Sequence, residues 1–453
     1  MKKIETIIFI AVVLVMISIP GVFTNIKSNQ TSKMDNRMLQ EFPSMDDEGF
    51  QKDVELYLSD RVGFRENMIT LYQTLCDKVF SKLVYPLYAY GKDGHVMMTH
   101  DLTTFQHADV DQNYVENLGE YLKSLEDFCG SMGSEFLFFL CPNKESIYPE
   151  YFPDGYFVKE QPNRSDRIAE ALTKKKVPFI FPRELFMELK NEELLYNQKY
   201  DAAHWNDTGC FYGNREIINY LGRSFPTIGE LEKEEFQINE VVQPYLKNSY
   251  FRIDERVPDY TLKKTDSAEE PDVFSQIELT APQLHHQYYR NTENQELPRI
   301  LIFGDSYFEY VSKFYLNHSF ELMSLHSDNM KNAEYYISLF QPDIVIVEFV
   351  ERVLQVPNAI DDERIAKRFP SGAYEEKIEQ GIQIESYNTR GNKFISVHGS
   401  FDDLDQKMML KAVVNEKAYY AKRDGNTFCF TFKREDILEN HRIDFYKCYE
   451  PEN

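Results

Sequence analysis

The sequence is poor in the residues that mark several classes of protein. Only 6 of its 453 residues are cysteine, and no two of them form a C-x-x-C pair. This excludes a small disulfide-stapled scaffold and gives no sign of a zinc-thiolate or thiol-redox site. Basic residues are also scarce, since Lys and Arg total 50 against 74 for Asp and Glu, a net charge of −24. Nucleic-acid binders and polybasic membrane-surface proteins both need a basic face, so neither class fits.

Tryptophan is rarer still, because Trp205 is the only one in a chain with 34 Phe and 30 Tyr. A hydrophobic fraction of 42% is too high for a disordered chain. The sequence contains neither internal repeats nor low-complexity segments. At roughly 150 residues per domain, its length predicts two or three folded domains.

The N-terminus has the layout of an export signal. An unbroken apolar run, Ile7 to Ile17, follows Lys2 and Lys3. Because no A-x-A-like cleavage site follows, an uncleaved signal anchor is favoured over a cleaved signal peptide, and a buried core helix is the third interpretation. We therefore expect a transmembrane helix over residues 1–27 and a single-pass cell-membrane protein whose bulk is extracytoplasmic.

The middle of the chain alternates short apolar runs with helical stretches. After a linker and helical segment over 28–84, the apolar runs fall at 136–141, 177–181, 300–303, 320–325 and 344–347. Continuous runs of this length are typical of buried parallel strands, so an α/β domain is predicted over 85–355. The less regular stretch 227–296 is interpreted as a charged insertion or lid.

The last segment, 375–453, has a different character. Strand-like stretches follow one another closely at 381–387, 393–401, 408–414, 427–432 and 442–446. The turn signal Asp424-Gly425 separates two strand-like stretches. A small all-β, sandwich-like domain is therefore predicted. Its Cys429 and Cys448 either pair after export or remain reduced in the core.

Polar residues follow three of the central apolar runs. They are Gly304-Asp305-Ser306, Pro142 to Glu145, and Glu348 with Glu351-Arg352. Ligands of open α/β sheets bind at the carboxyl ends of the strands, so these groups are expected at one edge. Ser306 would lie where a strand enters a helix that starts near Phe308, a place where backbone amides stabilise an oxyanion. The alternative is that Asp305 or Ser306 only caps that helix.

One of the ten histidines has suggestive neighbours. His204 follows Asp201 by three residues and precedes Trp205. A carboxylate near a histidine can orient it as the base for a serine nucleophile. The alternatives are a capping Asp beside a partly buried His, or a metal site that includes Asp207, although no second His is near. Trp205 is either core packing or the wall of a sugar-binding pocket.

Two adjacent histidines, His285-His286, could also bind a metal, but no third ligand is evident. Adjacent histidines usually face in different directions. No metal site is therefore predicted from the sequence.

Taken together, these motifs resemble the SGNH (GDSL-type) hydrolase superfamily, and within it the DHHW group and the alginate O-acetylation proteins. The matching stretches span residues 36–355: Asn36-Arg37, Phe42-Pro43, Asp60, Arg65, Gly91 to Gly94, Pro142 to Lys144, Ile147 to Pro149, Asp201 to Trp205, Gly209, Gly304 to Ser306, Glu348 and Glu351-Arg352. The resemblance implies a flavodoxin-like three-layer α/β fold. The last hundred residues lie outside it.

The resemblance also implies a catalytic triad of Ser306 as nucleophile, His204 as general base and Asp201 as its orienter. The chain departs from the group in two ways, because Asp201 stands three rather than two residues before His204 and no G-x-N-D block is present. Asn143 takes the place of that block as an oxyanion or substrate-binding donor. The other substrate or oxyanion candidates are Lys144, Trp205, Asp305, Tyr307 and Arg352; Lys144 and Arg352 have structural ion pairs as their alternative role.

Three functions follow from these expectations. The leading one is a membrane-anchored O-acetyltransferase that acts on a cell-surface or exported polysaccharide, with a multi-pass membrane acyltransferase supplying acetyl groups. The second is a carbohydrate O-acetyl esterase with the same triad, and the third is a non-catalytic glycan-binding or scaffold protein. None of them requires a metal, an organic cofactor or a nucleic-acid partner.

Overall fold

The structure is a computed structural model. It describes residues 2–32, 37–45, 49–80, 83, 87–106, 111–156, 163–247, 251–355, 362–369, 375–389, 391–402, 408–437 and 442–449. The chain divides into two units. Unit 1 consists of Met1–Thr99, Asn197–Ala202 and Glu240–Val257, and unit 2 of His100–Tyr196, Ala203–Asn239 and Pro258–Asn453. The domain boundaries predicted from the sequence stay a prediction.

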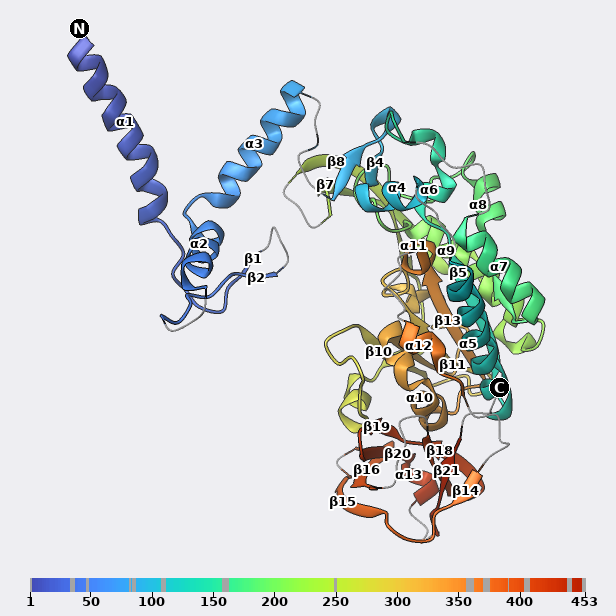
Figure 1. Ribbon diagram of the computed structural model, residues 1–453. Helices are drawn as coiled ribbons and strands as arrows, with labels where there is room; N and C mark the ends of the chain where they lie inside the picture. The colour runs from blue at the N-terminus through green and yellow to red at the C-terminus, as the bar shows by residue number, and fades with distance from the viewer. Residues whose placement is uncertain are drawn as a thin grey trace. The chain divides into compact units, whose positions relative to one another are not determined.

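Unit 1 is built from helices and short strand pairs (Figure 1). Its elements are α1 (Lys2–Val22), β1 (Thr31–Ser32), β2 (Arg37–Met38), α2 (Phe50–Arg61), α3 (Arg65–Phe80), β3 (Tyr88–Tyr90) and β4 (Val96–Met98). Strands β3 and β4 form a hairpin around a turn in which Asp93 and Gly94 have φ of 52° and 75°. A small apolar cluster that includes Val96, Ala202 and Phe251 supports it.

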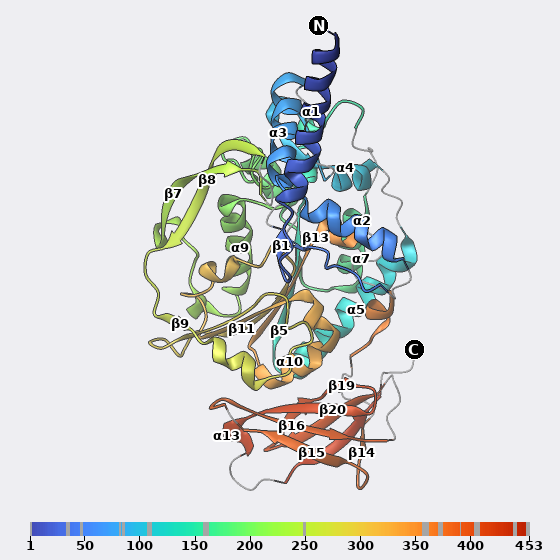
Figure 2. The same cartoon turned by 90° about the vertical axis from the view of Figure 1, so that its left-hand side faces the viewer.

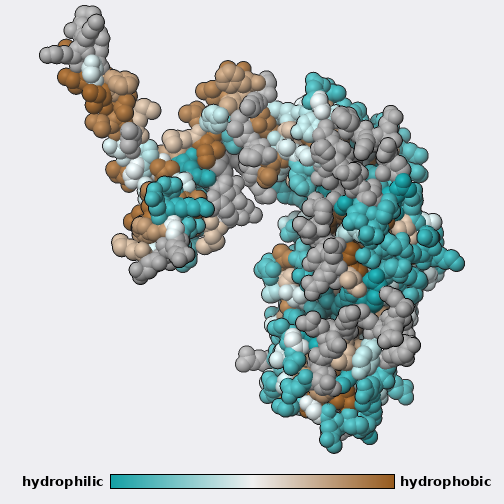
Figure 3. All heavy atoms as spheres, viewed as in Figure 1, coloured by the Kyte–Doolittle hydropathy of each residue, from teal (hydrophilic) through white to brown (hydrophobic). Residues whose placement is uncertain are grey.

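Helix α1 lies where the membrane anchor was expected. Apolar side chains are exposed along both α1 and α3, as the brown surface in Figure 3 shows. Within the described ranges, however, no helix combines the length and the apolar character that crossing a membrane requires. The structure therefore does not support the predicted transmembrane helix.

A seven-stranded sheet organises unit 2 (Figure 2). Its order is β6-β5-β13-β11-β12-β10-β9, and β6, β5, β13, β11 and β12 run parallel. The strands are β5 (Glu135–Cys141), β6 (Phe179–Ile180), β9 (Ser267–Glu269), β10 (His286–Asn291), β11 (Arg299–Gly304), β12 (Glu321–His326) and β13 (Ile344–Val350). All five predicted apolar runs thus correspond to parallel strands.

The stretch 227–296 is more regular than the predicted charged insertion. Strands β7 (Phe236–Tyr245) and β8 (Arg252–Leu262) form a two-stranded ribbon. Strands β9 and β10 then join the main sheet, where β10 pairs antiparallel with both β9 and β12. The sequence of β10, HQYYRN, lacks an apolar run because this strand lies near the edge of the sheet.

The order of the parallel strands departs from the expected flavodoxin-like order. Numbered along the chain, they read 2-1-5-3-4 across the sheet, whereas a flavodoxin-like sheet reads 2-1-3-4-5. If numbering starts at β11 and continues through β12, β13, β5 and β6, the expected order returns. The fold is thus a circular permutation of the flavodoxin-like arrangement. This explains why the Asp201–Trp205 block precedes Ser306 in the sequence.

Helices cover both faces of this sheet, which is why its central strands contain continuous apolar runs. One face packs against α5 (Gln112–Ser131), α7 (Arg164–Lys175) and α10 (Ala333–Phe340). The other packs against Trp205 and α9 (Asp207–Leu221). The remaining helices are α4 (Thr99–Gln106), α6 (Lys144–Ile147), α8 (Arg183–Leu189), α11 (Glu351–Gln355) and α12 (Asp362–Ala366). The three-layer α/β architecture is therefore as predicted.

The C-terminal part of unit 2 is a β-sandwich of two four-stranded sheets, β14-β21-β17-β18 and β15-β16-β20-β19 (Figure 2). The strands are β14 (Glu375–Lys377), β15 (Gln383–Asn388), β16 (Phe394–Ser400), β17 (Met409–Val414), β18 (Lys417–Tyr420), β19 (Lys422–Asp424), β20 (Thr427–Lys433) and β21 (Asp444–Cys448). A short helix, α13 (Arg434–Ile437), lies between β20 and β21. Both sheets share one apolar core, and all five predicted strands are present. All six cysteines are unpaired and buried, so Cys429 and Cys448 do not form a disulfide.

Candidate active site

The fold brings Ser306 and His204 together, although 102 positions separate them in the sequence. Nε2 of His204 lies 2.9 Å from Oγ of Ser306, within hydrogen-bond distance. Ser306 is exposed and His204 is half-buried, so the pair is accessible from solvent. A histidine that contacts a serine hydroxyl in this way can accept its proton, which is the first requirement of a serine nucleophile.

A tight turn presents Ser306 at the carboxyl end of β11. Gly304 ends the strand, and a Cβ atom there would come within 2.4 Å of Cβ of Phe308, so only glycine allows this close approach. Oδ1 of Asp305 accepts a hydrogen bond from the amide of Tyr307 at 2.8 Å, and the carbonyl of Asp305 accepts one from Phe308 at 3.0 Å. Asp305 is buried and shapes the turn, and its predicted role in binding a substrate stays a prediction.

The predicted helix after Ser306 is absent. The chain continues in turns, and the first helical element is a short 3₁₀ helix, Val311–Phe314. Phe308, Val311 and Phe314 are all buried, a spacing of three residues that suits the three-residue repeat of a 3₁₀ turn. The prediction that a helix N-terminus stabilises an oxyanion at Ser306 is therefore wrong. The amide of Asp305 donates to Glu348 and that of Tyr307 to Asp305, which leaves the amide of Ser306 itself as the candidate donor.

Two buried carboxylates at the end of β13 hold the loops on either side of it. Oε2 of Glu348 accepts the amide of Asp305 at 3.0 Å, and Oδ2 of Asp305 in turn accepts the amide of Val350 at 2.9 Å. Oε2 of Glu351 accepts the amide of Asn143 at 2.7 Å and the hydroxyl of Ser146. Burial raises the pKa of both glutamates, and the charge of Asp305 raises that of Glu348 further.

The peptide bond before His204 is fixed by two side chains. The carbonyl of Ala203 accepts a hydrogen bond from the hydroxyl of Tyr307 at 2.5 Å and another from Nη1 of Arg352 at 2.6 Å. The guanidinium of Arg352 also lies 4.9 Å from the centre of the Tyr307 ring. Tyr307 is buried, and both residues position the backbone of His204. The substrate or oxyanion role predicted for both stays a prediction.

Asp201 lies in unit 1, whereas His204 lies in unit 2. Oδ2 of Asp201 forms an ion pair with Nζ of Lys247 at 2.5 Å, and Asp201 is buried. Its role as the orienter of His204 stays a prediction.

Trp205 packs in the core. Only 7% of its surface is exposed. Its indole nitrogen donates to the carbonyl of Tyr307 at 3.2 Å, and a Cβ at Gly213 on α9 would come within 2.6 Å of its ring. Its ring also lies near those of Phe139, Tyr307 and Phe308. Its role as a wall of a sugar-binding pocket stays a prediction.

Asn143 and Lys144 are fully buried at the end of β5. Asn143 forms no side-chain hydrogen bond with any described residue, so nothing connects it to Ser306 or His204. Its interpretation as an oxyanion or substrate-binding donor, like that of Lys144, stays a prediction.

Sequence reasoning missed two buried acids in this region. Asp101, on α4, is 1% exposed, and its Oδ2 lies 3.9 Å from Nη1 of Arg352. Burial raises the pKa of Asp101, while the nearby charges of Arg352, His100 and His204 oppose that rise. Burial and Asp101 also raise the pKa of Glu145 to about 8. No motif marks Asp101, because it stands about one hundred positions before His204 in the sequence.

The permuted flavodoxin-like sheet and the Ser306–His204 pair at its carboxyl edge define an SGNH-type hydrolase or acyltransferase domain. Residues 89–318, just over half of the chain, match the family described as the SGNH hydrolase-like domain of acetyltransferase AlgX. The chain belongs to this family, and it is an acyltransferase or esterase of the SGNH type.

Several solved structures resemble the chain. PatB1 of Bacillus cereus is 16% identical, with a TM-score of 0.46 over 58% of this chain and 95% of PatB1. A DHHW family protein from Eubacterium siraeum is 15% identical, with a TM-score of 0.43 over 63% of this chain and 96% of that one. The O-acetyltransferase domain of Pseudomonas putida AlgJ is 15% identical, with a TM-score of 0.42 over 62% and 98%. No curated protein matches the chain.

Proposed function

We propose that this chain is an extracytoplasmic, membrane-anchored O-acetyltransferase that acts on a cell-surface or exported polysaccharide. The observation that carries the proposal is the 2.9 Å contact between Nε2 of His204 and Oγ of Ser306 in a domain of the AlgX family. A hydroxyl so placed is activated for attack on an acyl carbonyl.

The reaction proceeds through an acyl-serine. Nε2 of His204 takes the proton from Ser306 as Oγ attacks the donor ester, and the protonated imidazole returns it to the leaving group. A sugar hydroxyl then gives its proton to His204 and attacks the acyl-serine, which releases the acetylated sugar and restores Ser306. Asp201 orients His204 and stabilises its protonated form in this proposal.

The oxyanion that forms in each step requires hydrogen-bond donors aimed at it. The amide of Ser306 is the candidate, since its two neighbours in the turn are already engaged. Tyr307 and Arg352 contribute indirectly, by holding the peptide before His204 in place. Precise positioning of the base is worth a large part of the rate in such enzymes.

Export and anchoring are supported by the sequence, in which the run Ile7 to Ile17 follows two lysines. Acetyl donors are made in the cytosol, so an extracytoplasmic transferase needs a partner that passes the acetyl group across the bilayer. We assign that step to a multi-pass membrane acyltransferase. Recovery of the chain in the membrane fraction, and its release by high salt or carbonate, would respectively support and contradict the anchor.

Hydrolysis is the second candidate function. Ser306 is exposed, so water can reach an acyl group on it. In that case the same acyl-enzyme would be resolved by water, and the chain would be a carbohydrate O-acetyl esterase. Transfer and hydrolysis differ in how well the bound acceptor excludes water.

One assay separates the two. The full chain is incubated with a chromogenic acetyl ester, with and without an oligosaccharide acceptor, and both acetate and acetylated sugar are measured. Acetylated sugar that forms at the expense of acetate supports transfer, whereas acetate release that is indifferent to the acceptor supports hydrolysis. If Ser306→Ala retains the activity of the wild type, both proposals fail.

A further inference from the structure

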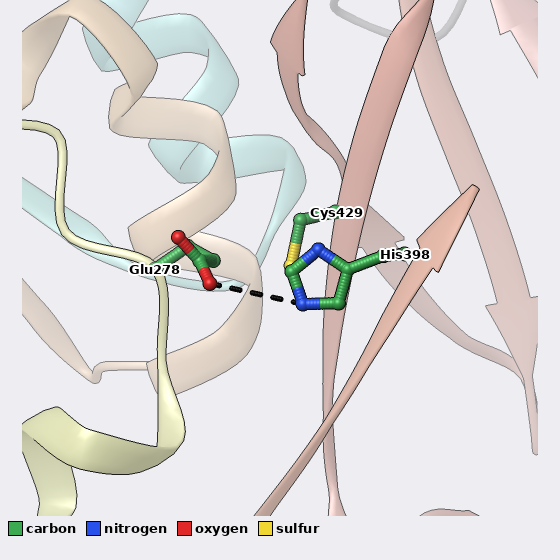
Figure 4. Close-up of side chains that lie close together, drawn as sticks. All are labelled: Glu278, His398 and Cys429. Atoms are coloured by element: carbon green, nitrogen blue, oxygen red, sulfur yellow. Dashed lines mark hydrogen bonds and ion pairs between the residues drawn. The ribbon is translucent and has the colours of Figure 1, made fainter. Parts of the chain in front are cut away.

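A cluster of side chains of the types that bind metals lies between the α/β domain and the β-sandwich, and it shares no residue with the Ser306–His204 site. Glu278 comes from the loop after the 3₁₀ helix Pro271–Gln276, His398 from β16 and Cys429 from β20 (Figure 4). Their carboxylate, imidazole and thiol atoms all lie within 4.8 Å of one another. We propose that these three residues bind a single divalent transition-metal ion of the zinc class, which joins the two domains.

The donor geometry fits such an ion. Nε2 of His398 lies 3.7 Å from Oε1 of Glu278 and 3.9 Å from Sγ of Cys429. A tetrahedral zinc with bonds of about 2.0 Å to nitrogen and oxygen and about 2.3 Å to sulfur keeps its ligand atoms roughly 3.3 to 3.6 Å apart. The two separations from His398 thus need to shorten by a few tenths of an ångström, and the separation of Glu278 from Cys429, which is at most 4.8 Å, by no more than about 1 Å. One carboxylate, one imidazole and one thiolate are also the ligand types that zinc prefers.

The strands fix two of the ligands relative to each other. His398 and Cys429 are direct partners in the antiparallel pairing of β16 with β20, so their side chains lie on the same face of the sheet. Cys429 is buried and His398 is about one-third exposed. The thiol thus forms the floor of the site, and solvent reaches the side where a fourth ligand, such as water, would bind.

The loop that carries Glu278 is tied to the same strands. The hydroxyl of Ser396 donates to the carbonyl of Gln276 at 2.8 Å, and Oε1 of Gln276 accepts the amide of Phe394 at 3.2 Å. The amide of Glu278 donates to the hydroxyl of Tyr335 at 2.9 Å, and that hydroxyl lies 2.7 Å from Oγ1 of Thr431 on β20. The backbone of all three ligands is therefore held in place before any ion binds, which lowers the cost of forming the site.

The local charges also suit a divalent ion. The carboxylate of Glu278 and the thiolate of Cys429 together neutralise two positive charges. Coordination replaces the thiol proton of Cys429, which leaves to solvent.

The test uses Co²⁺ alone as a spectroscopic probe on the full chain, after treatment with a chelator. We expect one Co²⁺ per chain, a near-ultraviolet thiolate-to-cobalt absorption band, and loss of that band when Zn²⁺ is added. Cys429→Ser should abolish the band. The matched control Cys448→Ser, which removes another buried cysteine of the same sandwich, should retain it.

Circular dichroism shows whether Cys429→Ser is folded. A second variant keeps the test decisive if it is not. His398→Gln alters a partly exposed side chain and should weaken Co²⁺ binding by about 100-fold or more, since even indirect partners of metal ligands cost 10- to 100-fold. Absence of stoichiometric binding to the wild type would overturn the proposal. So would a thiolate band that persists in Cys429→Ser, or an unchanged affinity in His398→Gln.

Discussion

The loops after β11 and β5 are held by the same kind of hydrogen bond, but their polar side chains differ in exposure to solvent. Each is tied through a backbone amide to a buried glutamate at the end of β13: Asp305 to Glu348, and Asn143 to Glu351. Yet Ser306 on the first loop is exposed, whereas Asn143 on the second is completely buried.

The difference shows that position at the carboxyl edge of the sheet does not by itself make a residue functional. Both loops follow apolar strands, and both carry polar residues of types that occur in catalytic sites. The tight turn at Gly304 turns Ser306 toward His204, while the chain after β5 enters the short helix α6 and turns inward. The loop after β11 is therefore the one to which we assign the chemistry, and the loop after β5 is its buried counterpart.

The largest expected effect is the loss of the nucleophile. Ser306→Ala should lower kcat by roughly 10⁴-fold or more, because the acyl-enzyme cannot form. Its melting temperature should match that of the wild type, since the side chain is exposed. Ester turnover and thermal unfolding measure the two effects. Ser224→Ala, another exposed serine, is the control and should retain full activity.

The second prediction concerns Asp201, the proposed orienter of His204. Asp201→Asn should lower kcat by on the order of 10³- to 10⁴-fold, the cost of losing the orienting carboxylate of a triad. Asp101→Asn leaves Asp201 in place and should cost less in kcat. Steady-state kinetics on both variants check this. If Asp101→Asn were the more damaging, Asp101 would take over the role assigned to Asp201.

Removing the buried glutamate that holds each loop, Glu348 or Glu351, should sharpen the comparison between the loops. Glu348→Ala and Glu351→Ala each leave a buried amide without its acceptor, so each should reduce the free energy of unfolding by about 1 to 3 kcal/mol. Only Glu348→Ala should also lower kcat well beyond its effect on KM, since it frees the turn that carries Ser306. Equal loss of kcat in both variants would break the distinction. Chemical denaturation and steady-state kinetics supply the two readouts.

The smallest expected effect is a pH dependence of stability that arises beside the buried loop. Glu145 has its pKa raised from 4.5 to about 8, so the native state keeps its proton between these pH values while the unfolded state releases it. Stability should therefore fall as the pH rises through this window. Glu145→Gln removes this titration, and its stability relative to the wild type should rise by on the order of 2 kcal/mol between pH 5 and pH 8. Urea denaturation across this range tests it, and a constant difference would contradict it.

The sequence predicted the strands of this fold far better than the turns between them. The apolar runs at 136–141 and 344–347 were recognisable because strands buried on both faces are apolar at every position. Strand β10, the neighbour of the edge strand β9, was not predicted because its sequence, HQYYRN, has no such run. The prediction of a helix after Ser306 was wrong because apolar residues at every third position also suit turns and 3₁₀ geometry.

The site was partly predictable for a similar reason. Local spacing drew attention to Ser306 and His204, which the fold brings together. It left two interpretations of Trp205, because a lone tryptophan beside a histidine looks the same in sequence whether it faces a ligand or the core, where the structure buries it. Contacts that depend on distant segments, such as Asp101 with Arg352, leave no local pattern.

The central claim is that Ser306 carries the acyl group. The most direct test is to mix the full chain with a chromogenic acetyl ester, quench it during turnover and map the modified peptide by mass spectrometry. The account predicts a single acetyl group on Ser306, absent from Ser306→Ala and lost over time when acceptor is added. Turnover without any acetyl group on Ser306, or turnover that persists in Ser306→Ala, would contradict it.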